Sequence, residues 1–174
     1  VLVPHLCSSL EIDETKLMPV FDDFYANYFG KLKVVASPNI SARNAVLAVL
    51  DQGMKAVVAT NPIFPIAAIQ QRMEWAGIAD LPFTMVTSYE TSHYCKPQIA
   101  YYQEVLTSIQ CAPAECLMVG NDVDEDLIAA KLGMKTYRVT DWIINRKNIH
   151  PTLDYRGSLD ELAKFLVGSN LSNL

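Results

Sequence analysis

The stretch Cys116-Leu-Met-Val-Gly-Asn-Asp-Val-Asp-Glu-Asp126 decides the fold of this 174-residue chain. An apolar run of strand length stops there abruptly at polar residues. This pattern is typical of strands in open α/β sheets, which bind ligands beyond their carboxyl ends. The stretch Val57-Val-Ala-Thr-Asn-Pro62 has the same form, and Cys95-Lys-Pro97 lies between the two in the chain. We therefore expect polar side chains from these segments to meet at one edge of a parallel sheet.

Helical and strand patterns alternate along most of the chain. We predict strands at 55–60, 83–87, 116–119 and 135–139, and helices at 42–52, 66–76, 97–109, 124–132 and 159–167. Ser41 has the residue type of an N-cap for the first of these helices, and a helical segment over 12–29 is expected to break near Pro19. Strands that alternate with helices predict a parallel sheet covered on both faces.

Composition narrows the class of protein. With 51% hydrophobic residues and a mean hydropathy of +0.14, the chain has enough apolar material for one well-buried domain, alone or with a small appendage. A net charge of −5 without a Lys/Arg run argues against a nucleic-acid partner. No apolar stretch reaches the ~20 residues that span a bilayer, and the cysteines form no metal-binding pattern. We expect a cytoplasmic protein with reduced thiols that binds neither nucleic acid nor membranes.

Three polar residues are candidates for binding a phosphoryl group. Thr60 and Asn61 follow an apolar run, and their hydroxyl and amide donors suit phosphoryl oxygens; the alternative is that they only cap a turn. Lys96 precedes Pro97, and proline is favoured at the first helical position, so the ammonium is expected beside the backbone donors of a helix start. The alternative for Lys96 is a solvated surface lysine.

Acidic residues follow the strand predicted at 116–119. Asp122 and Asp126 offer carboxylate oxygens, and Mg²⁺ commonly takes one or two such ligands while keeping water and substrate oxygens. The alternative is that acids in a first helical turn only interact favourably with the helix dipole, which is worth ~0.3–1 kcal/mol each. We expect Asp124 and Glu125 to do only that, and we assign Asp122 to the metal with Asp126 assisting.

The three segments resemble motifs two, three and four of the haloacid dehalogenase superfamily, in the same order along the chain. The resemblance implies an α/β fold with a Rossmann-like three-layer α/β/α parallel sheet. Residues 33–174 would form this core, and residues 1–32 would be the remnant of a helical cap. Family members often have Gly-Asp where this chain has Gly120-Asn121-Asp122, so either Asn121 or Asp122 could be the metal ligand.

The resemblance also implies a function. Most members are magnesium-dependent phosphatases, so we expect a hydrolase that acts on a small phosphorylated metabolite through an aspartyl-phosphate, with Mg²⁺ as cofactor. The implied catalytic residues are Thr60, Lys96, Asp122 and Asp126, of which the last two would bind the metal. Thr60, Asn61 and Lys96 would bind the phosphate.

The family's first motif, an Asp-x-Asp at the end of a first strand that carries the nucleophile, has no counterpart before the second motif. The resemblance places that strand in the middle of the sheet, so its loss would leave two neighbouring strands with unpaired backbone groups. We expect the native polypeptide to be longer, with a missing N-terminal segment or a partner strand, and this chain alone to be inactive. Two alternatives stay open: an incomplete relative or pseudoenzyme that acts as a binding module, and a dehalogenase, in which acidic Mg²⁺ ligands would have no purpose.

Overall fold

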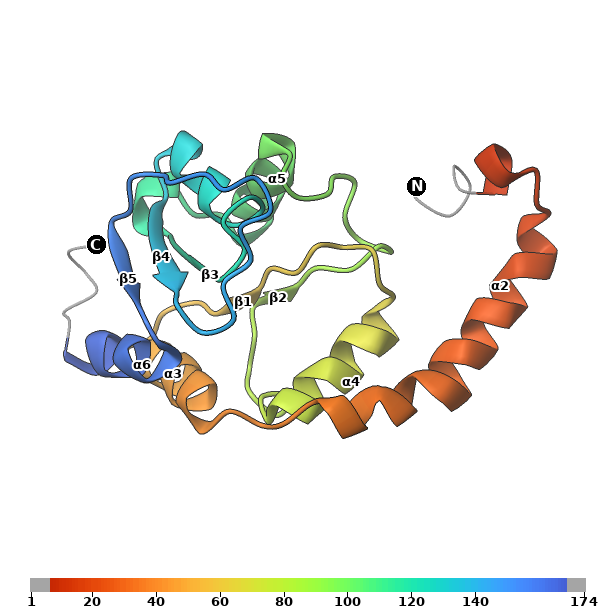
Figure 1. The fold of residues 1–174 in the computed structure, drawn as a ribbon, viewed down its shortest axis with the longest axis horizontal. Coiled ribbons are helices and arrows are strands. Elements are labelled where there is room, and N and C mark those ends of the chain that lie inside the picture. The colour runs from red at the N-terminus through yellow and green to blue at the C-terminus, as the bar shows by residue number, and fades with distance from the viewer. Residues whose placement is uncertain (1–6, 169–174) are drawn as a thin grey trace.

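The strands of the chain form two separate parallel sheets in the computed structural model, which describes residues 7–168 (Figure 1). One sheet pairs β1 (Val57–Val58) with β2 (Met85–Val86), and the other has the order β3 (Leu117–Gly120), β4 (Lys135–Val139) and β5 (Tyr155–Gly157). Val57 lies opposite Met85, and Leu117 lies opposite Lys135. All of these strand pairs are parallel, as the alternation of helices and strands predicts.

Helices cover both faces of the strands (Figure 1). On one face, α3 (Ile40–Asp51) and α6 (Leu159–Gly168) pack on β4 through a cluster of seven buried residues: Ala45, Ala48, Tyr137, Val139, Leu162, Ala163 and Leu166. On the other face, α5 (Ile99–Ile109) and the 3₁₀ segment Leu127–Leu132 pack on Met118 of β3. The predicted three-layer α/β/α arrangement is therefore confirmed.

Two helices of the lower layer in Figure 1 begin at polar capping residues. Asn39, and not Ser41 as predicted, caps α3, because its side-chain oxygen accepts hydrogen bonds from the backbone N–H of Ser41 and Ala42 at 2.9 and 3.3 Å. Ser158 and Glu161 form a reciprocal pair at the start of α6: Glu161 N–H donates to Ser158 Oγ at 3.2 Å, and Ser158 N–H donates to Glu161 Oε2 at 2.7 Å. Such a capping box satisfies backbone donors that a helix start leaves free.

Several predicted boundaries differ from the structure. The strands predicted at 55–60 and 83–87 shrink to two residues each in β1 and β2, because only Val57 with Met85 and Val58 with Val86 are paired. The helix predicted at 124–132 begins at Leu127 and is 3₁₀, since Asp122 holds the preceding residues in a turn. Strand β5 was not predicted, because three residues carry too little pattern. The helix at 66–76 is confirmed as α4 (Ile66–Ala76), and Gly77 ends it with a φ of +75°.

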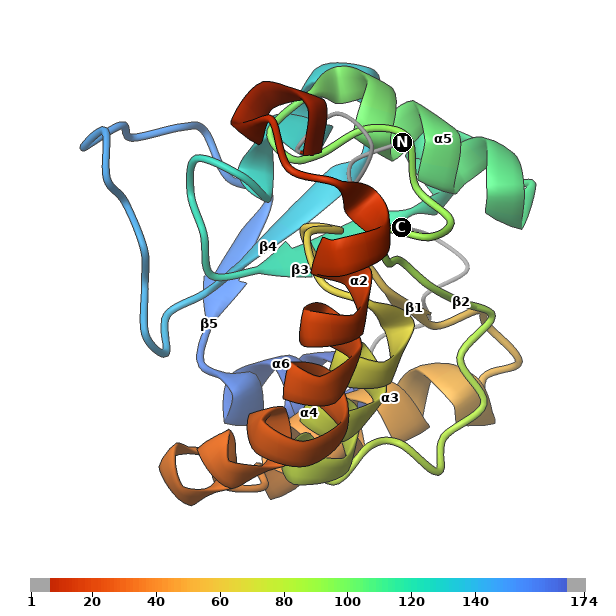
Figure 2. The ribbon, with the colours of Figure 1, turned by 90° about the vertical axis from the view of Figure 1, so that its right-hand side faces the viewer.

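An N-terminal helical arm stands in front of α4 in Figure 2. It runs through α2 (Glu14–Asp23), a π-helical turn (Phe24–Tyr28) and a 3₁₀ segment (Phe29–Val35). Pro19 lies inside α2 and does not break it, contrary to the prediction. Because α2 buries no residue, water can bond the carbonyl that the proline leaves free.

The arm is anchored to α4 at its far end. Phe29 is buried and stacks on Trp75 with ring centroids 5.3 Å apart, and Gln71 Nε2 donates to the Tyr25 carbonyl at 3.1 Å. That residues 1–32 belong to a cap stays a prediction. Within residues 7–168 no helix is long and apolar enough to cross a membrane, and all four cysteines are free thiols.

Candidate functional site

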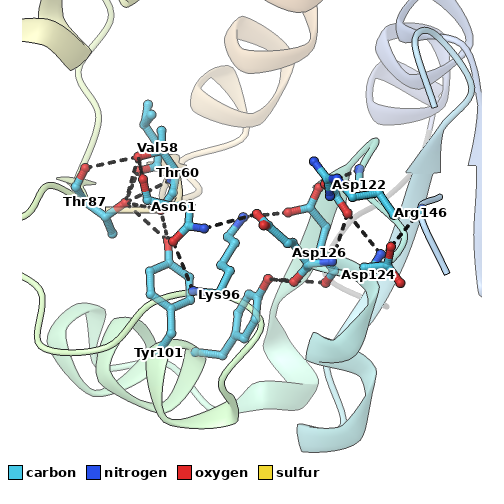
Figure 3. Close-up of polar contacts among 12 residues, drawn as sticks. Val58, Thr60, Asn61, Thr87, Lys96, Tyr101, Asp122, Asp124, Asp126 and Arg146 are labelled. Carbon is cyan, nitrogen blue, oxygen red and sulfur yellow. Dashed lines mark hydrogen bonds and ion pairs between the residues drawn. The ribbon is translucent and has the colours of Figure 1, made fainter. Parts of the chain in front are cut away.

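Three loops meet where β1 and β3 end (Figure 3). Asn61, just beyond β1, connects them: its side-chain oxygen accepts a hydrogen bond from the Lys96 backbone N–H at 3.2 Å, and its amide donates to Glu125 Oε2 at 3.4 Å. Glu125 belongs to the turn after β3, and Lys96 lies between β2 and α5. The structure therefore brings together the polar ends of the three sequence segments.

Lys96 and Asp126 form a buried ion pair at the centre of the site. The distance from Lys96 Nζ to Asp126 Oδ1 is 2.6 Å, and the two side chains are only 4% and 9% exposed. The rings of Tyr101 and Tyr102 lie 5.7 and 5.8 Å from the ammonium and add cation–π attraction. A buried charge is tolerated when it is paired and hydrogen-bonded, which holds here for both partners.

Lys96 is not a surface lysine, and it does not sit at a helix start as predicted. Helix α5 begins at Ile99 with Gln98 as its N-cap, because the Gln98 N–H bonds to the Cys95 carbonyl at 2.9 Å and closes a turn first. The ammonium instead points inward toward Asp126 (Figure 3). The positive charge of Lys96 is therefore stabilised by a carboxylate and two aromatic rings.

Both carboxylate oxygens of Asp122 accept hydrogen bonds. Its Oδ1 accepts the backbone N–H groups of Asp124 and Glu125 at 3.0 and 3.1 Å, and its Oδ2 accepts Arg146 Nη1 at 2.6 Å. Its own N–H donates to Asp126 Oδ2 at 3.0 Å, so the two candidate metal ligands are in direct contact. The hydrogen bond to Asp122 raises the pKa of Arg146, and this guanidinium therefore stays charged.

Asp124 connects the loop after β4 to the site through hydrogen bonds. Its Oδ2 accepts the backbone N–H of Arg146 at 3.0 Å and of Lys147 at 3.3 Å, whereas its Oδ1 is buried and has no hydrogen-bond partner. The expectation that Asp124 acts only on a helix dipole is wrong, because no regular helix starts beside it and its side chain accepts the backbone N–H groups of Arg146 and Lys147. Asn121 adds a further tie through its amide, which donates to the Trp142 carbonyl at 2.6 Å.

Thr60 is positioned through its backbone. Its N–H donates to Thr87 Oγ1 at 2.9 Å, and its carbonyl accepts from Thr87 Oγ1 at 2.9 Å and from the Tyr101 hydroxyl at 2.8 Å. Burial raises the pKa of Tyr101, which keeps this hydroxyl protonated as a donor. The Thr60 hydroxyl itself makes only long contacts of 3.4–3.5 Å, so it is free to bond a ligand.

The carboxylate oxygens that follow β3 are the type of ligand that a hard cation binds. Asp122 Oδ2 and both carboxylate oxygens of Asp126 each accept one hydrogen bond and keep a second lone pair, whereas Asp122 Oδ1 already accepts two N–H groups. Within residues 7–168 no group of three or more His, Cys, Asp or Glu side chains is arranged to hold a metal ion. Mg²⁺ commonly uses only one or two protein carboxylates, so Asp122 and Asp126 fit it in ligand type and number.

Three residues of the site were missed from the sequence. Thr87 is fully buried at the end of β2, and a hydroxyl at a strand end is the same signal that identified Thr60. Tyr101 was read only as part of a helix, and its hydroxyl carries no sequence signal. Arg146 comes from a loop after β4, 24 residues from Asp122, and no local pattern could place it there.

Comparisons with known proteins identify the family and show similar folds. A family described as haloacid dehalogenase-like hydrolase matches residues 8–139. A search of curated proteins gave no match. Among solved structures, a predicted phosphoglycolate phosphatase from Haemophilus somnus 129PT superimposes with a TM-score of 0.64 at 21% identity, over 94% of this chain and 73% of that one.

Two further structures share the fold. The HAD phosphatase from Thermococcus onnurineus gives a TM-score of 0.54 at 22% identity, over 71% of this chain and 55% of that one. YfnB from Bacillus subtilis, bound to magnesium, gives 0.54 at 23% identity, over 69% of this chain and 53% of that one. The chain thus spans about half the length of these two proteins. Because the family match covers most of its residues, the chain belongs to the haloacid dehalogenase-like hydrolases.

Proposed function

We propose that the protein containing these 174 residues is a Mg²⁺-dependent phosphohydrolase of a small phosphorylated metabolite. The observation that carries the proposal is the linkage of Asn61, Lys96 and Asp126 at the ends of β1 and β3. This linkage places donors that suit an anion beside carboxylate oxygens that suit a cation. Membership in this hydrolase family and the phosphatases among the similar structures support it.

Thr60, Asn61 and Lys96 would bind the phosphoryl group. The Thr60 hydroxyl is a free donor, and the Lys96 ammonium has three N–H donors of which Asp126 takes one. Lys96 would then neutralise charge on the phosphoryl oxygens in a buried setting, where electrostatic attraction is stronger than in water. Tyr101 would position Thr60 through its bond to the Thr60 carbonyl.

Asp122 and Asp126 would hold the Mg²⁺ ion. Asp122 is favoured over Asn121, because the Asn121 amide is turned to the Trp142 carbonyl while Asp122 is buried against Asp126. When bound, the ion would supply a Lewis acid that orients and neutralises the phosphoryl oxygens. Asp122 Oδ2 would keep one lone pair for the ion beside the bond it accepts from Arg146, whereas Asp122 Oδ1 already accepts two backbone N–H groups.

The covalent step needs an aspartate nucleophile, which we place outside residues 1–174 on the strength of the family resemblance. This chain alone would therefore bind phosphate and Mg²⁺ without turning over a substrate. Supplying the nucleophile and a second aspartate as general acid and base would complete an aspartyl-phosphate mechanism.

The test is a screen of phosphorylated metabolites and p-nitrophenyl phosphate on the longest natural form of the protein, with and without Mg²⁺. We expect hydrolysis that requires Mg²⁺ and falls by more than ~10²-fold in Lys96→Ala and in Asp122→Asn, the order of magnitude for losing an electrostatic contact to the transition state. Lys131→Ala and Asp51→Asn, both at exposed positions, are matched controls. Undiminished hydrolysis in Lys96→Ala or Asp122→Asn removes that residue from the site, and no Mg²⁺-dependent hydrolysis at all overturns the proposal.

A further inference from the structure

Two cysteines flank the short turn that connects α5 to β3 (Figure 1). Cys111 lies just after α5, and Cys116 directly precedes β3. Within the turn, Glu115 N–H donates to the Ala112 carbonyl at 3.0 Å, and Ala112 N–H donates to Glu115 Oε2 at 2.8 Å. Cys116 N–H donates to the Pro113 carbonyl at 3.1 Å. These bonds close the turn and keep the two cysteines near each other.

The two thiols also contact each other. Burial and the adjacent Cys111 sulfur, through its charge and a side-chain hydrogen bond, raise the pKa of the Cys116 thiol to about 11. Both cysteines line the same cavity, which has a volume of about 790 Å³. Cys116 is therefore a protonated thiol at neutral pH, and it lies beside a second sulfur.

A lysine ammonium lies next to Cys111. Lys55 Nζ donates to the Ile109 carbonyl at 2.6 Å and to Cys111 Sγ at 3.8 Å. The bond to this carbonyl, at the last residue of α5, fixes the ammonium beside the sulfur. A neighbouring cation stabilises the negative charge that a sulfur carries when it attacks an oxidant. Among residues 7–168, no other cysteine sulfur accepts a hydrogen bond from a lysine or arginine.

Cys111 can be reached from the surface. Its side chain is half-buried, and it also lines a second, shallow hollow of about 660 Å³ together with Thr107 and Pro113. Cys116 is not part of the wall of this hollow. A small oxidant can therefore reach Cys111 without entering the cavity that both cysteines share.

We propose that Cys111 and Cys116 form a site of reversible oxidation by hydroperoxides. In the first step the Cys111 sulfur attacks an oxygen of the hydroperoxide, the O–O bond breaks, water or an alcohol leaves, and Cys111 becomes a sulfenic acid. In the second step the Cys116 sulfur attacks the Cys111 sulfur, the S–O bond breaks, and the thiol proton leaves with the hydroxyl group as water. Two thiols are thus oxidised to one disulfide, and one hydroperoxide is reduced. A small thiol in excess restores both cysteines by disulfide exchange.

Other roles for these two cysteines fit less well. A structural zinc site needs four ligands, and within residues 7–168 no group of three or more His, Cys, Asp or Glu side chains is arranged to hold a metal ion. A packing role alone suits fully buried thiols, whereas both of these side chains are only half-buried and one of them contacts an ammonium. A pair made of an accessible sulfur and a second sulfur beside it is typical of redox-sensitive cysteines.

The test treats the longest natural form of the protein with hydrogen peroxide at neutral pH and follows each cysteine by mass spectrometry of its peptides. We expect a disulfide between Cys111 and Cys116 to form at least about tenfold faster than Cys95, a half-buried control, is oxidised. Dithiothreitol should remove it. A disulfide that forms no faster than Cys95 reacts, or one that forms equally fast in urea-unfolded protein, overturns the proposal.

Variants test the role of each side chain. Cys116→Ser should stop the reaction at a Cys111 sulfenic acid, which dimedone traps, whereas Cys111→Ser should give neither a trapped adduct at 116 nor a disulfide. Lys55→Met should slow the first step by at least about threefold, and Lys131→Met, at an exposed position, should not. A trapped adduct at 116 in place of 111, or an unchanged rate in Lys55→Met, contradicts the proposed mechanism. The phosphatase proposal does not depend on these outcomes, because Cys116 precedes β3 and the candidate site follows it.

Discussion

The Lys96 ammonium and the Asp126 carboxylate face each other at 2.6 Å with almost no access to water. The pair links two segments that are 30 residues apart, the stretch before α5 and the turn after β3. In a low-dielectric interior each charge depends on the other, since an isolated buried ion loses its hydration without compensation. The pair therefore contributes both to the shape of the site and to the stability of the domain.

Removing one charge of this pair is expected to destabilise the protein. In Lys96→Met the Asp126 carboxylate stays buried without a cation, and we expect a loss of about 3–5 kcal/mol in the free energy of unfolding. Urea denaturation measures it, with Lys131→Met as the exposed control. The double variant Lys96→Met/Asp126→Asn removes both charges, keeps an acceptor for the Asp122 N–H, and is expected to recover most of the loss. A double variant as unstable as the single one would show that packing, not charge, explains the effect.

Arg146 is expected to weaken Mg²⁺ binding by holding Asp122. Its guanidinium is mostly exposed, so water screens the bond to Asp122 Oδ2, and Arg146→Gln should raise Mg²⁺ affinity by up to about fivefold. Isothermal titration calorimetry with MgCl₂ measures this directly. Arg156→Gln, an exposed arginine of β5, is the control for a change in net charge. The same gain in both variants would assign the effect to net charge alone.

Tyr101 is expected to stabilise the loop after β1. Its ring is fully buried, and its hydroxyl donates to the Thr60 carbonyl at 2.8 Å, so Tyr101→Phe should cost about 0.5–1.5 kcal/mol of unfolding free energy. Chemical denaturation provides the value, and Tyr94→Phe, at an exposed position, should change it little. In the longest natural form, Tyr101→Phe should raise KM for the phosphorylated substrate, because Thr60 would be less well positioned. An unchanged KM and an unchanged stability would exclude this positioning role.

The Arg43–Asp80 ion pair predicts a specific pH dependence of stability. Hydrogen bonds from Arg43 lower the pKa of Asp80 to about 2. Because the folded-state pKa is below the unfolded value of about 3.9, the stabilisation is present above that value and is lost as pH falls toward 2. The difference in unfolding free energy between the protein and Asp80→Asn should therefore be constant at neutral pH and shrink between about pH 4 and 2. A flat difference for Asp80→Asn over this pH range would contradict the assignment.

Much of the fold was predictable, because apolar runs and helical periodicity in the sequence indicate which residues are buried. Strand β4 and helix α4 were predicted with the boundaries that the structure has. The end of α4 is clear in the sequence, because Gly77 follows it. The N-cap of α3 was assigned to Ser41 in place of Asn39, since both residue types can cap and only the backbone geometry decides between them. Short strands such as β5 escape prediction because three residues show too little alternation.

The site was predictable where its residues follow strands. Asn61 and Asp122 follow the carboxyl ends of β1 and β3, where an apolar run that stops at polar residues marks the end of a strand. The depth of Lys96 could not be predicted, because its burial depends on Asp126 and two tyrosine rings that approach from other elements. The contact of Arg146 with Asp122 could not be predicted for the same reason, since Arg146 lies in a loop 24 residues further along the chain.

Gly120, at the end of β3, has no room for a side chain, because a Cβ there would overlap the carboxylate and the Cβ of Asp126. Any larger residue at 120 must push away the group that pairs with Lys96 and caps the Asp122 N–H. Over evolutionary time the two positions should therefore change as a unit: a lineage that replaces Gly120 is expected to have first replaced Asp126 with something smaller. A sequence in which 120 carries a bulky residue while 126 is still aspartate would mark a protein whose site is built differently.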